Sequence, residues 1–574
     1  MSGYAKGAEY KPGMKFTSEQ GQHSWNGVLV EGAWRLVDCH WAARRLVGKK
    51  VTAENVRYEL DEYYFMPDPH QLIFTHFPDD PNWQLLDRAI ALSDFENLVP
   101  VKSAFFKYGL QILSHRQAVV DADREITVRI ACPMTQAATL AFTFTLTYDD
   151  GREDYKGTKL SRFGMQEMVD NVSFFTIRPP ERGQYRLIIY AKDLKHETKE
   201  GIYGGVCEYE LACNSSAHKA VPFPPCVHTS WGPGDSVGKY KLEPQQKGAI
   251  FSTVQGTAEV RFKIGEELRF TAKLKSTTLD EKQLQGFIMY RVVGEVAIFT
   301  IYAPMQGEYG LEIYANNPEK DGNSLYHAYQ YLIICMESLS SVEPLPTLPP
   351  GYLGAQPMCS KLGLKPTSHI DPFVQGSHGQ EVLAFSLTQP LRMTSQLIHV
   401  SKGGEEDLSD YVLQQGQEGQ AIFPVNLPKP GMYKFQLYGL PYNDSSESLP
   451  GVFNYLISCP NPRNNPMSFP KQYGQWKDGC YLFGPLDGHL SPQMPHVSGG
   501  SSEKSVYFRL SVPNANAVAV VVGEEWTQLE QDEGGVWAGD VPMEAFWGKE
   551  SKAAVCANYG SVKASYSTLL EYSM

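Results

Sequence analysis

The segment Gly183-Gln184-Tyr185-Arg186-Leu187 has two further copies in this 574-residue chain. It returns as Gly307-Glu308-Tyr309-Gly310-Leu311 and as Gly431-Met432-Tyr433-Lys434-Phe435, 124 residues further along each time. A phenylalanine and a proline precede each copy at fixed distances, and a tyrosine follows each one. Solenoid repeats have periods of about 20–50 residues, so a period of this length indicates tandem domains.

The residues around each copy form short alternating patterns separated by Gly and Pro, which are typical of β-sandwiches. The Gly-x-Tyr-x-Leu step resembles the tyrosine corner of immunoglobulin-like folds, in which a Tyr stands two residues before the second cysteine of the inter-sheet disulfide. Here Leu187, Leu311 and Phe435 occupy that cysteine position. We therefore expect immunoglobulin-like sandwiches held by apolar packing instead of a disulfide, as suits a reducing compartment.

These units divide the chain into an N-terminal region and four sandwiches, the fourth of which is a diverged copy that places Trp547 at the corner position. The expected limits are 1–100 for the N-terminal region and 101–215, 216–340, 341–461 and 462–574 for the sandwiches. Segments rich in Ser, Asn and Pro separate the units and predict semi-rigid linkers. These linkers are Ser215–Pro225, Ser338–Gly354 and Asn461–Pro470.

The composition excludes several classes of function. The chain has 51 basic and 64 acidic residues and a formal net charge of −13, with no basic block. This balance argues against nucleic acid or an anionic membrane as the main partner. No apolar run approaches the length of about 18 residues that a spanning helix needs. The ten cysteines are scattered, without zinc-ligand spacing, so we expect a cytosolic protein without a cofactor or metal.

A candidate catalytic pair, His23 and Asp38, flanks a predicted hairpin near the N-terminus. Glu31 and Gly32 supply turn chemistry between two strand-like runs. If these two residues form the loop, Trp25 lies opposite Asp38, and His23 is a diagonal neighbour of Asp38 on the same face. Diagonal Cβ atoms lie roughly 7–8 Å apart, which is near enough for an imidazole to hydrogen-bond a carboxylate. The carboxylate would then orient the ring toward a nucleophile, although an ordinary hairpin with one His and one Asp is the alternative.

The same part of the chain resembles the hillarin and kyphoscoliosis peptidase family of the transglutaminase-like superfamily. The resemblance is carried by His23, Trp25, Asn26, Trp34, Leu36, Asp38 and Trp41, and by residues 58–65, 68–78 and 83–86. It implies that residues 1–100 are the C-terminal part of a papain-like α+β core with a Cys-His-Asp triad. His23 would be the base and Asp38 the residue that orients it, with Trp25 and Trp41 walling the site. It further implies a cytoplasmic, cytoskeleton-associated protein with filament-associated partners and a protein substrate.

The nucleophilic cysteine of the family lies upstream of the histidine, whereas the first cysteine here is Cys39. We expect a sequence truncated at its N-terminus before that cysteine, with a true pseudoenzyme as the alternative. In both cases we expect residues 1–574 alone to be inactive. A non-catalytic cytoskeletal scaffold is the competing function. An extracellular adhesion protein is disfavoured because the disulfide positions hold other residues.

Two other arrangements of reactive residues are given structural interpretations. The densest cluster of potential metal ligands has irregular spacing and is interrupted by prolines, so we interpret its members as loop and turn residues. They are Asp68, His70, His76, Asp79 and Asp80. Cys39 is adjacent to Asp38, and neighbouring strand residues point to opposite faces. We therefore expect Cys39 to face away from the pair and not to act as the nucleophile.

Overall fold

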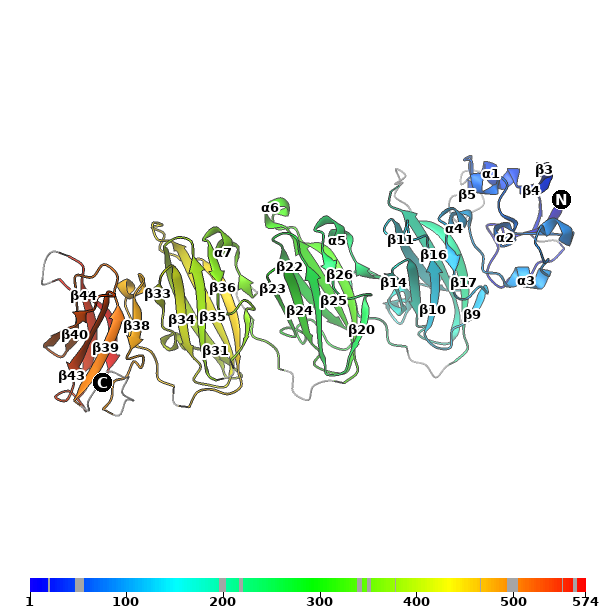
Figure 1. The fold of residues 1–574 in the computed structure, drawn as a ribbon. Helices are drawn as coiled ribbons and strands as arrows, with labels where there is room; N and C mark the ends of the chain where they lie inside the picture. The colour runs from blue at the N-terminus through cyan, green and yellow to red at the C-terminus, as the bar shows by residue number, and fades with distance from the viewer. Residues whose placement is uncertain are drawn as a thin grey trace. The chain divides into compact units, whose positions relative to one another are not determined.

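The computed structural model is mainly β, as predicted, with short helices between the strands (Figure 1). It describes residues 1–18, 21–46, 56–195, 203–215, 220–337, 343–347, 353–376, 378–464, 466–492, 504–549, 551–560 and 565–574. Parts of all three predicted linkers, 216–219, 338–342, 348–352 and 465, lie outside the described residues. The chain forms two compact units, Met1–Val260 with Gly265–Ile288 and Ile301–Glu343, and Arg261–Ile264 with Met289–Thr300 and Pro344–Met574.

The N-terminal region contains a three-stranded sheet in the order β2-β1-β7, from Gln22–Ser24, Ser2–Ala5 and His76–Pro78. Strands β3 (Asn26–Val30) and β4 (Ala33–Val37) form the predicted hairpin. Glu31 and Gly32 both have positive φ angles, as a two-residue type I′ turn requires. The remaining elements are α1 (Cys39–Ala43), β5 (Arg45–Leu46), β6 (Val56–Arg57), η2 (Glu62–Tyr64), α2 (Pro69–Leu72), η3 (Pro81–Gln84) and α3 (Leu92–Asn97).

The first immunoglobulin-like sandwich packs two sheets around one apolar core. One sheet has the order β11-β16-β17-β9. The other contains β14-β15-β10-β8 and continues from β14 to β18 (Ser230–Pro233), with which β14 pairs in parallel. Its elements are α4 (Ser103–Lys107), β8 (Gln111–Ile112), β9 (Val119–Asp121), β10 (Ile126–Ala131), β11 (Leu140–Tyr148), β12 (Asp154–Tyr155), β13 (Thr158–Lys159), η4 (Leu160–Phe163), β14 (Gly164–Val169), β15 (Val172–Ile177), β16 (Gly183–Asp193) and β17 (Gly204–Cys213).

The next two sandwiches have a similar order of strands. In each of them a short helix precedes the first long strand. The second contains β18 (Ser230–Pro233), α5 (Asp235–Lys239), β19 (Glu243–Pro244), β20 (Ile250–Thr253), β21 (Thr257–Lys263), β22 (Arg269–Ser276), β23 (Ile288–Val293), β24 (Val296–Tyr302), β25 (Gly307–Asn316), α6 (Pro318–Asp321) and β26 (Tyr326–Cys335). The third contains β27 (Gly354–Ala355), α7 (Pro357–Lys361), β28 (Leu364–Pro366), β29 (Phe373–Gln375), β30 (Gln380–Leu387), β31 (Leu391–Ser401), β32 (Gly404–Asp407), η5 (Ser409–Tyr411), β33 (Gln415–Gln417), β34 (Gln420–Asn426), β35 (Gly431–Pro441) and β36 (Gly451–Cys459).

The tyrosine corner is present in all three copies of the repeat. The hydroxyl of Tyr185 donates to the carbonyl of Glu181 at 2.7 Å, and Tyr309 and Tyr433 make the same bond to the residue four positions earlier. The residues at the former cysteine position, Leu187, Leu311 and Phe435, are fully buried. All ten cysteines are free thiols. The expected replacement of the disulfide by apolar packing is therefore confirmed.

The C-terminal sandwich departs from the pattern of the other three. Trp547 lies in a turn between β43 (Val536–Pro542) and β44 (Lys552–Asn558), so its predicted equivalence with the corner tyrosines, which lie within strands, is wrong. Its other elements are β37 (Lys471–Gln472), η6 (Gly474–Lys477), β38 (Tyr481–Gly484), β39 (Ser505–Ser511), β40 (Ala517–Val522), β41 (Glu525–Gln528), β42 (Glu530–Gln531) and β45 (Ser567–Ser573).

Candidate active site

Strand β1 places two histidines on one face of the N-terminal sheet. His23 on β2 lies opposite Gly3, and His76 on β7 lies opposite Ala5. Gly3 and Ala5 are two residues apart on β1, so their side-chain positions, and those of their partners, share one face. A strand only four residues long therefore brings together two histidines that are 53 positions apart in the sequence.

Gly3 leaves room for the aromatic wall of this face. A Cβ atom at Gly3 would lie 2.1 Å from the backbone oxygen of Phe77 and 2.9 Å from the ring of Trp25. The centroid of the Trp25 ring lies 6.1 Å from that of His23 and 5.0 Å from that of His76. Trp41 also packs against both imidazoles, with centroids 5.3 and 4.6 Å away. Both tryptophans thus wall the histidines.

Asp38 reaches this face from the end of the β3–β4 hairpin. Strand β4 ends at Val37, and Asp38 is the N-cap of α1, where its Oδ1 atom accepts hydrogen bonds from the backbone amides of His40 and Trp41 at 2.9 Å. The predicted pairing of Trp25 with Asp38 across continuous strands is wrong, because β3 begins at Asn26 and pairs it with Val37. The helix cap fixes the carboxylate and leaves Oδ2 for the histidines.

The Oδ2 atom of Asp38 accepts a hydrogen bond from each histidine. The Nε2 atom of His23 lies 2.6 Å from Oδ2, and that of His76 lies 3.0 Å from it. Asp38 is only 1% exposed. Burial alone would raise the pKa of Asp38, but the hydrogen bonds from His23, His76 and the Trp41 amide outweigh it and hold that pKa well below its usual range. Asp38 is therefore a buried carboxylate with donors on both oxygens.

The buried His76 is held in one tautomer by Thr75. Burial lowers the pKa of His76 despite the contact with Asp38, so the ring is neutral at physiological pH. A neutral ring that donates from Nε2 to Asp38 must accept a hydrogen bond at Nδ1. The Thr75 hydroxyl lies 2.9 Å from Nδ1 and 3.1 Å from the Leu72 carbonyl, and its one proton satisfies the ring when it points to Nδ1, the nearer acceptor. His76 therefore has both ring nitrogens occupied and serves to hold the carboxylate.

The two nitrogens of His23 are in different situations. Nε2 donates to Asp38, whereas Nδ1 has no hydrogen-bond partner among the residues that the structure describes. The side chain retains 12% exposure, against 1% for that of His76. A ring oriented through one nitrogen and open at the other is the arrangement that a general base in a nucleophilic triad requires.

The interpretation of His76 as a structural loop residue is wrong, because His76 lies on β7 and contacts Asp38. Of the cluster in which it was placed, Asp68 and Asp80 cap α2 and η3, His70 lies exposed on α2, and Asp79 accepts from the Ser2 hydroxyl. Asp68, Asp79 and Asp80 thus lie at turns or helix starts, in line with the expected loop and turn residues, whereas His70 lies within α2. His76 differs from these residues because the pairing of β7 with β1, two segments far apart in the sequence, brings it to Asp38.

The histidines and Asp38 are also a candidate metal group, since their nearest ligand atoms all lie within 4.8 Å of one another. A tetrahedral zinc ion with bonds of about 2.0–2.1 Å would hold its ligand atoms about 3.3 Å apart. Here Oδ2 lies 2.6 and 3.0 Å from the two Nε2 atoms, which is hydrogen-bond spacing. Both nitrogens point at one oxygen, so the geometry favours a hydrogen-bonded centre.

Cys39 lies beside the site without reaching His23. The predicted strand alternation of Asp38 and Cys39 is wrong, because Cys39 is the first residue of α1. Its exposed thiol accepts a weak hydrogen bond from the Asn26 amide at 3.7 Å. The residues described by the structure place no thiol in hydrogen-bond contact with His23.

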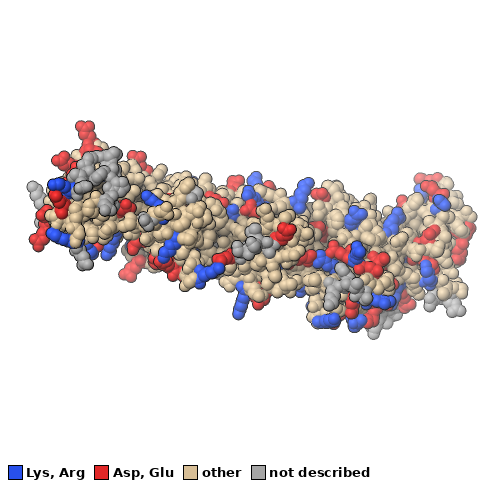
Figure 2. Space-filling model, turned by 90° about the horizontal axis from the view of Figure 1, so that it is seen from below, with Lys and Arg blue, Asp and Glu red and all other residues tan. Residues whose placement is uncertain are grey.

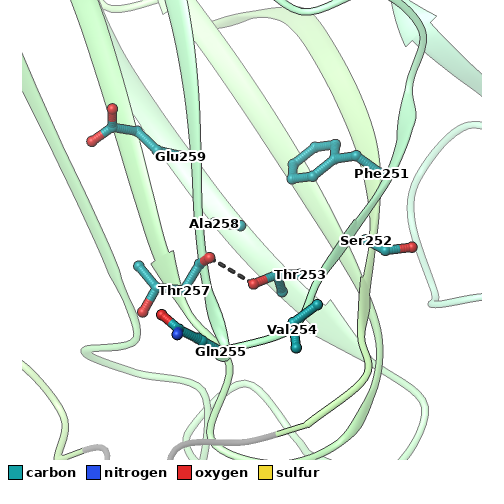
Figure 3. A pocket seen from close by; sticks show the side chains of 8 residues that line it. All are labelled: Phe251, Ser252, Thr253, Val254, Gln255, Thr257, Ala258 and Glu259. Atoms are coloured by element: carbon teal, nitrogen blue, oxygen red, sulfur yellow. Dashed lines mark hydrogen bonds between the residues drawn. The ribbon is translucent and has the colours of Figure 1, made fainter.

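Other surface features contain fewer reactive side chains. An open concavity lies at the turn between β20 and β21, where the Thr253 hydroxyl donates to the Thr257 carbonyl, and Glu259 is its one ionisable side chain (Figure 3). On the face seen in Figure 2, basic and acidic side chains are interspersed, as the composition indicated. No helix within the described residues is long and apolar enough to cross a membrane.

Comparison with known proteins identifies the family of this chain. Residues 92–224, 238–346 and 350–470 each match the family described as the KY-like, immunoglobulin-like domain. The chain belongs to this KY-like family. These segments contain the three copies of the repeat, so the predicted tandem immunoglobulin-like fold is confirmed.

Three relatives of this KY-like chain align with more than half of it. Hillarin of Drosophila melanogaster is 34% identical over 55% of this chain and 40% of its own length. The Lim and transglutaminase domain protein ltd-1 of Caenorhabditis elegans is 32% identical over 58% of this chain and 48% of its own. Kyphoscoliosis peptidase of Mus musculus is 28% identical over 58% and 47%. The expected family is confirmed, and the chain spans about half or less of these relatives.

Proposed function

We propose that His23 and Asp38 are the base and the orienting carboxylate of a Cys-His-Asp centre for acyl transfer or peptide hydrolysis. The observation that carries the proposal is the 2.6 Å bond from His23 Nε2 to a buried carboxylate, together with the open Nδ1 atom. The names of two relatives, a peptidase and a transglutaminase domain protein, support a reaction at an amide carbonyl. His76 joins the centre as the second residue that positions Asp38.

The chemistry assigned to this chain is proton transfer. In the whole protein, a cysteine from outside residues 1–574 would give its proton to His23 Nδ1, and its thiolate would attack a glutamine or peptide carbonyl. The imidazolium would then return the proton to the departing amine as the acyl-enzyme forms. Asp38 would stabilise the imidazolium through Nε2 without taking the proton itself. Water or an amine would resolve the acyl-enzyme, with the same base accepting its proton.

The cellular setting is part of the proposal. Ten free thiols, eight of them buried, support a reducing compartment such as the cytosol. We assign the protein to the cytoskeleton, as the resemblance to hillarin and kyphoscoliosis peptidase implies. Filament-associated proteins would be its partners and a cytoskeletal protein its substrate.

The test first determines the sequence of the 5′ end of the transcript and then uses the protein that the whole transcript encodes. Alkylation of a cysteine upstream of His23 should be about tenfold slower at pH 6 in His23→Ala, since the thiolate loses its imidazolium partner. His70→Ala, an exposed histidine of the same region, should leave the rate unchanged. Residues 1–574 alone should form no acyl-enzyme detectable by mass spectrometry. An acyl-enzyme on residues 1–574, or alkylation indifferent to His23, would contradict the proposal.

The second candidate function is a non-catalytic cytoskeletal scaffold. It is favoured by the three segments that match the immunoglobulin-like family, which together make up most of the chain. A transcript that encodes no cysteine upstream of His23 would support the scaffold and exclude the triad. The site would then be a remnant that stabilises the N-terminal sheet.

A further inference from the structure

The first immunoglobulin-like sandwich has an unprotected edge strand, β11. This nine-residue strand ends the sheet β11-β16-β17-β9 and pairs only with β16 within the part of the chain that the structure describes. The two ends of its outer edge are closed by turns, where the amides of Leu140 and Tyr148 donate to Gln136 and Arg152. The middle of the edge is left open.

The open backbone groups belong to Phe142, Phe144 and Leu146. They alternate with residues that face β16, so their N–H and C=O groups point outward, as those of Leu140 and Tyr148 do. Their side chains are in the core, yet the residues keep 3–5% exposure, whereas Leu187 and Ile189 on β16 have none. Unpaired edges of this kind are templates for a further strand.

The equivalent strand of the second sandwich carries protective charges. Tyr190 and Tyr314 are equivalent in the repeat, and they pair with Thr143 on β11 and Thr271 on β22. This register aligns Thr145 with Lys273. It likewise aligns Ala141 with Arg269 and Thr147 with Lys275. Charged residues on edge strands, lysine above all, are the usual protection against unwanted pairing. Strand β22 has three such residues on its outer face, whereas the aligned positions of β11 are all uncharged.

The third sandwich protects the same edge in another way. Its equivalent strand, β31, pairs at its end with the acidic strand β32, which covers residues 398–401. Leu397 beside this contact is fully buried. Within the described residues, the edge of the first sandwich therefore has neither the charges of β22 nor a covering strand, whereas β31 is covered at one end only.

We propose that β11 pairs with β11 of a second copy of this chain in an antiparallel arrangement centred on Phe144. Phe142 of one protomer would then lie opposite Leu146 of its partner, and the outward N–H and C=O groups would bond across the interface. On the outer face, Thr143 of one protomer would lie opposite Thr145 of its partner. Threonine pairs of this kind stabilise antiparallel strands.

Strand β11 of a second copy is a better pairing partner for β11 than the equivalent edge strands of the other sandwiches are. Pairing of β11 with β22 would place Lys273 and Lys275 against threonines of β11 that carry no charge, and it would cover Lys275, which is paired with Glu281 of its own chain. Covering these ammonium groups would cost free energy. Pairing of β11 with itself leaves no charge on the contacting side chains Ala141, Thr143, Thr145 and Thr147. The resulting two-fold contact is closed, so it gives dimers and not fibres.

The test is sedimentation velocity of residues 1–574 over a wide concentration range. The wild-type chain should pass from one chain to two as concentration rises, and hydrogen exchange at Phe142, Phe144 and Leu146 should slow in the dimer. Thr145→Lys with Thr147→Lys, which copies the pattern of β22, should weaken dimerisation at least about tenfold, or about 1.4 kcal/mol. Thr145 is exposed, so the variant should fold.

Thr271→Lys, at the equivalent of Thr143 on β22, is the matched control and should leave the dimer intact. Thr143→Lys is a second variant of the edge and should weaken the dimer as the double variant does. A wild-type chain that stays monomeric at all concentrations would overturn the proposal, even if the edge binds another protein. A dimer unaffected by lysines on β11 would overturn it equally.

Discussion

Asp38→Asn should lower the free energy of unfolding of the N-terminal region by about 3–6 kcal/mol, because it removes two hydrogen bonds to a charged group that are worth about 1.5–3 kcal/mol each. The asparagine can still cap α1 through its oxygen, but its amide group would then face the Nε2–H groups of His23 and His76. The asparagine NH₂ group and the two imidazole N–H groups would then meet without an acceptor, around a side chain that is 1% exposed in the wild-type protein. Hydrogen exchange of peptides from residues 1–100 would measure the loss.

Asp68→Asn is the matched control for this change. Asp68 caps α2 as Asp38 caps α1, but it is exposed. Asn and Asp are equally good N-caps, so Asp68→Asn should change stability by less than about 0.5 kcal/mol. Equal effects of the two substitutions would show that Asp38 acts only as a helix cap.

The same carboxylate predicts a dependence of stability on acid. The pKa of Asp38 is lower in the folded protein than in the unfolded chain. Its contribution is therefore complete above the unfolded value of about 3.9 and declines as the pH falls below it. Asp38→Asn should remove this part of the acid sensitivity of the N-terminal region.

His76→Phe should destabilise the N-terminal region by about 1.5–3 kcal/mol, the value of a buried hydrogen bond to a charged group. Phenylalanine keeps an aromatic ring against Trp25 and Trp41 but donates nothing to Asp38. Because burial lowers the pKa of His76, the unfolded chain takes up its proton first as the pH falls below about 6.5. The wild-type protein should lose stability from pH 7.5 to 5.5 more steeply than the variant does.

His70→Phe controls for the change of residue type, since His70 is exposed on α2. It should leave both stability and its pH dependence nearly unchanged. Thermal unfolding followed at several pH values compares the three proteins. If His76→Phe proved as stable as the wild-type protein at pH 7.5, the bond to Asp38 would contribute nothing.

The sequence predicted the contact of His23 with Asp38 but not the way in which it forms. The turn at Glu31 and Gly32 and the register of the hairpin were correct, because they depend on local turn chemistry. The strands do not continue to His23 and Asp38. His23 belongs to another sheet, and Asp38 caps a helix. The spacing of 15 residues was therefore informative, although the inferred geometry was wrong.

His76 could not be assigned from local patterns. Its position depends on the pairing of β7 with β1, two short strands more than 70 residues apart, and neither has a strong alternating pattern. In contrast, the tyrosine corners were predictable because each depends on residues within four positions and occurs three times. The three occurrences of the pattern made the tyrosine corner predictable, which a single occurrence would not have done.

The orientation of His23 is the central claim, and long-range proton–nitrogen NMR correlation of the histidine rings tests it most directly. The spectrum of residues 1–574 should show His23 protonated at Nε2 and unprotonated at Nδ1 at neutral pH, with the pattern altered in Asp38→Asn. A wild-type His23 protonated at Nδ1 instead, or one insensitive to Asp38→Asn, would contradict the assignment of a base oriented by this carboxylate.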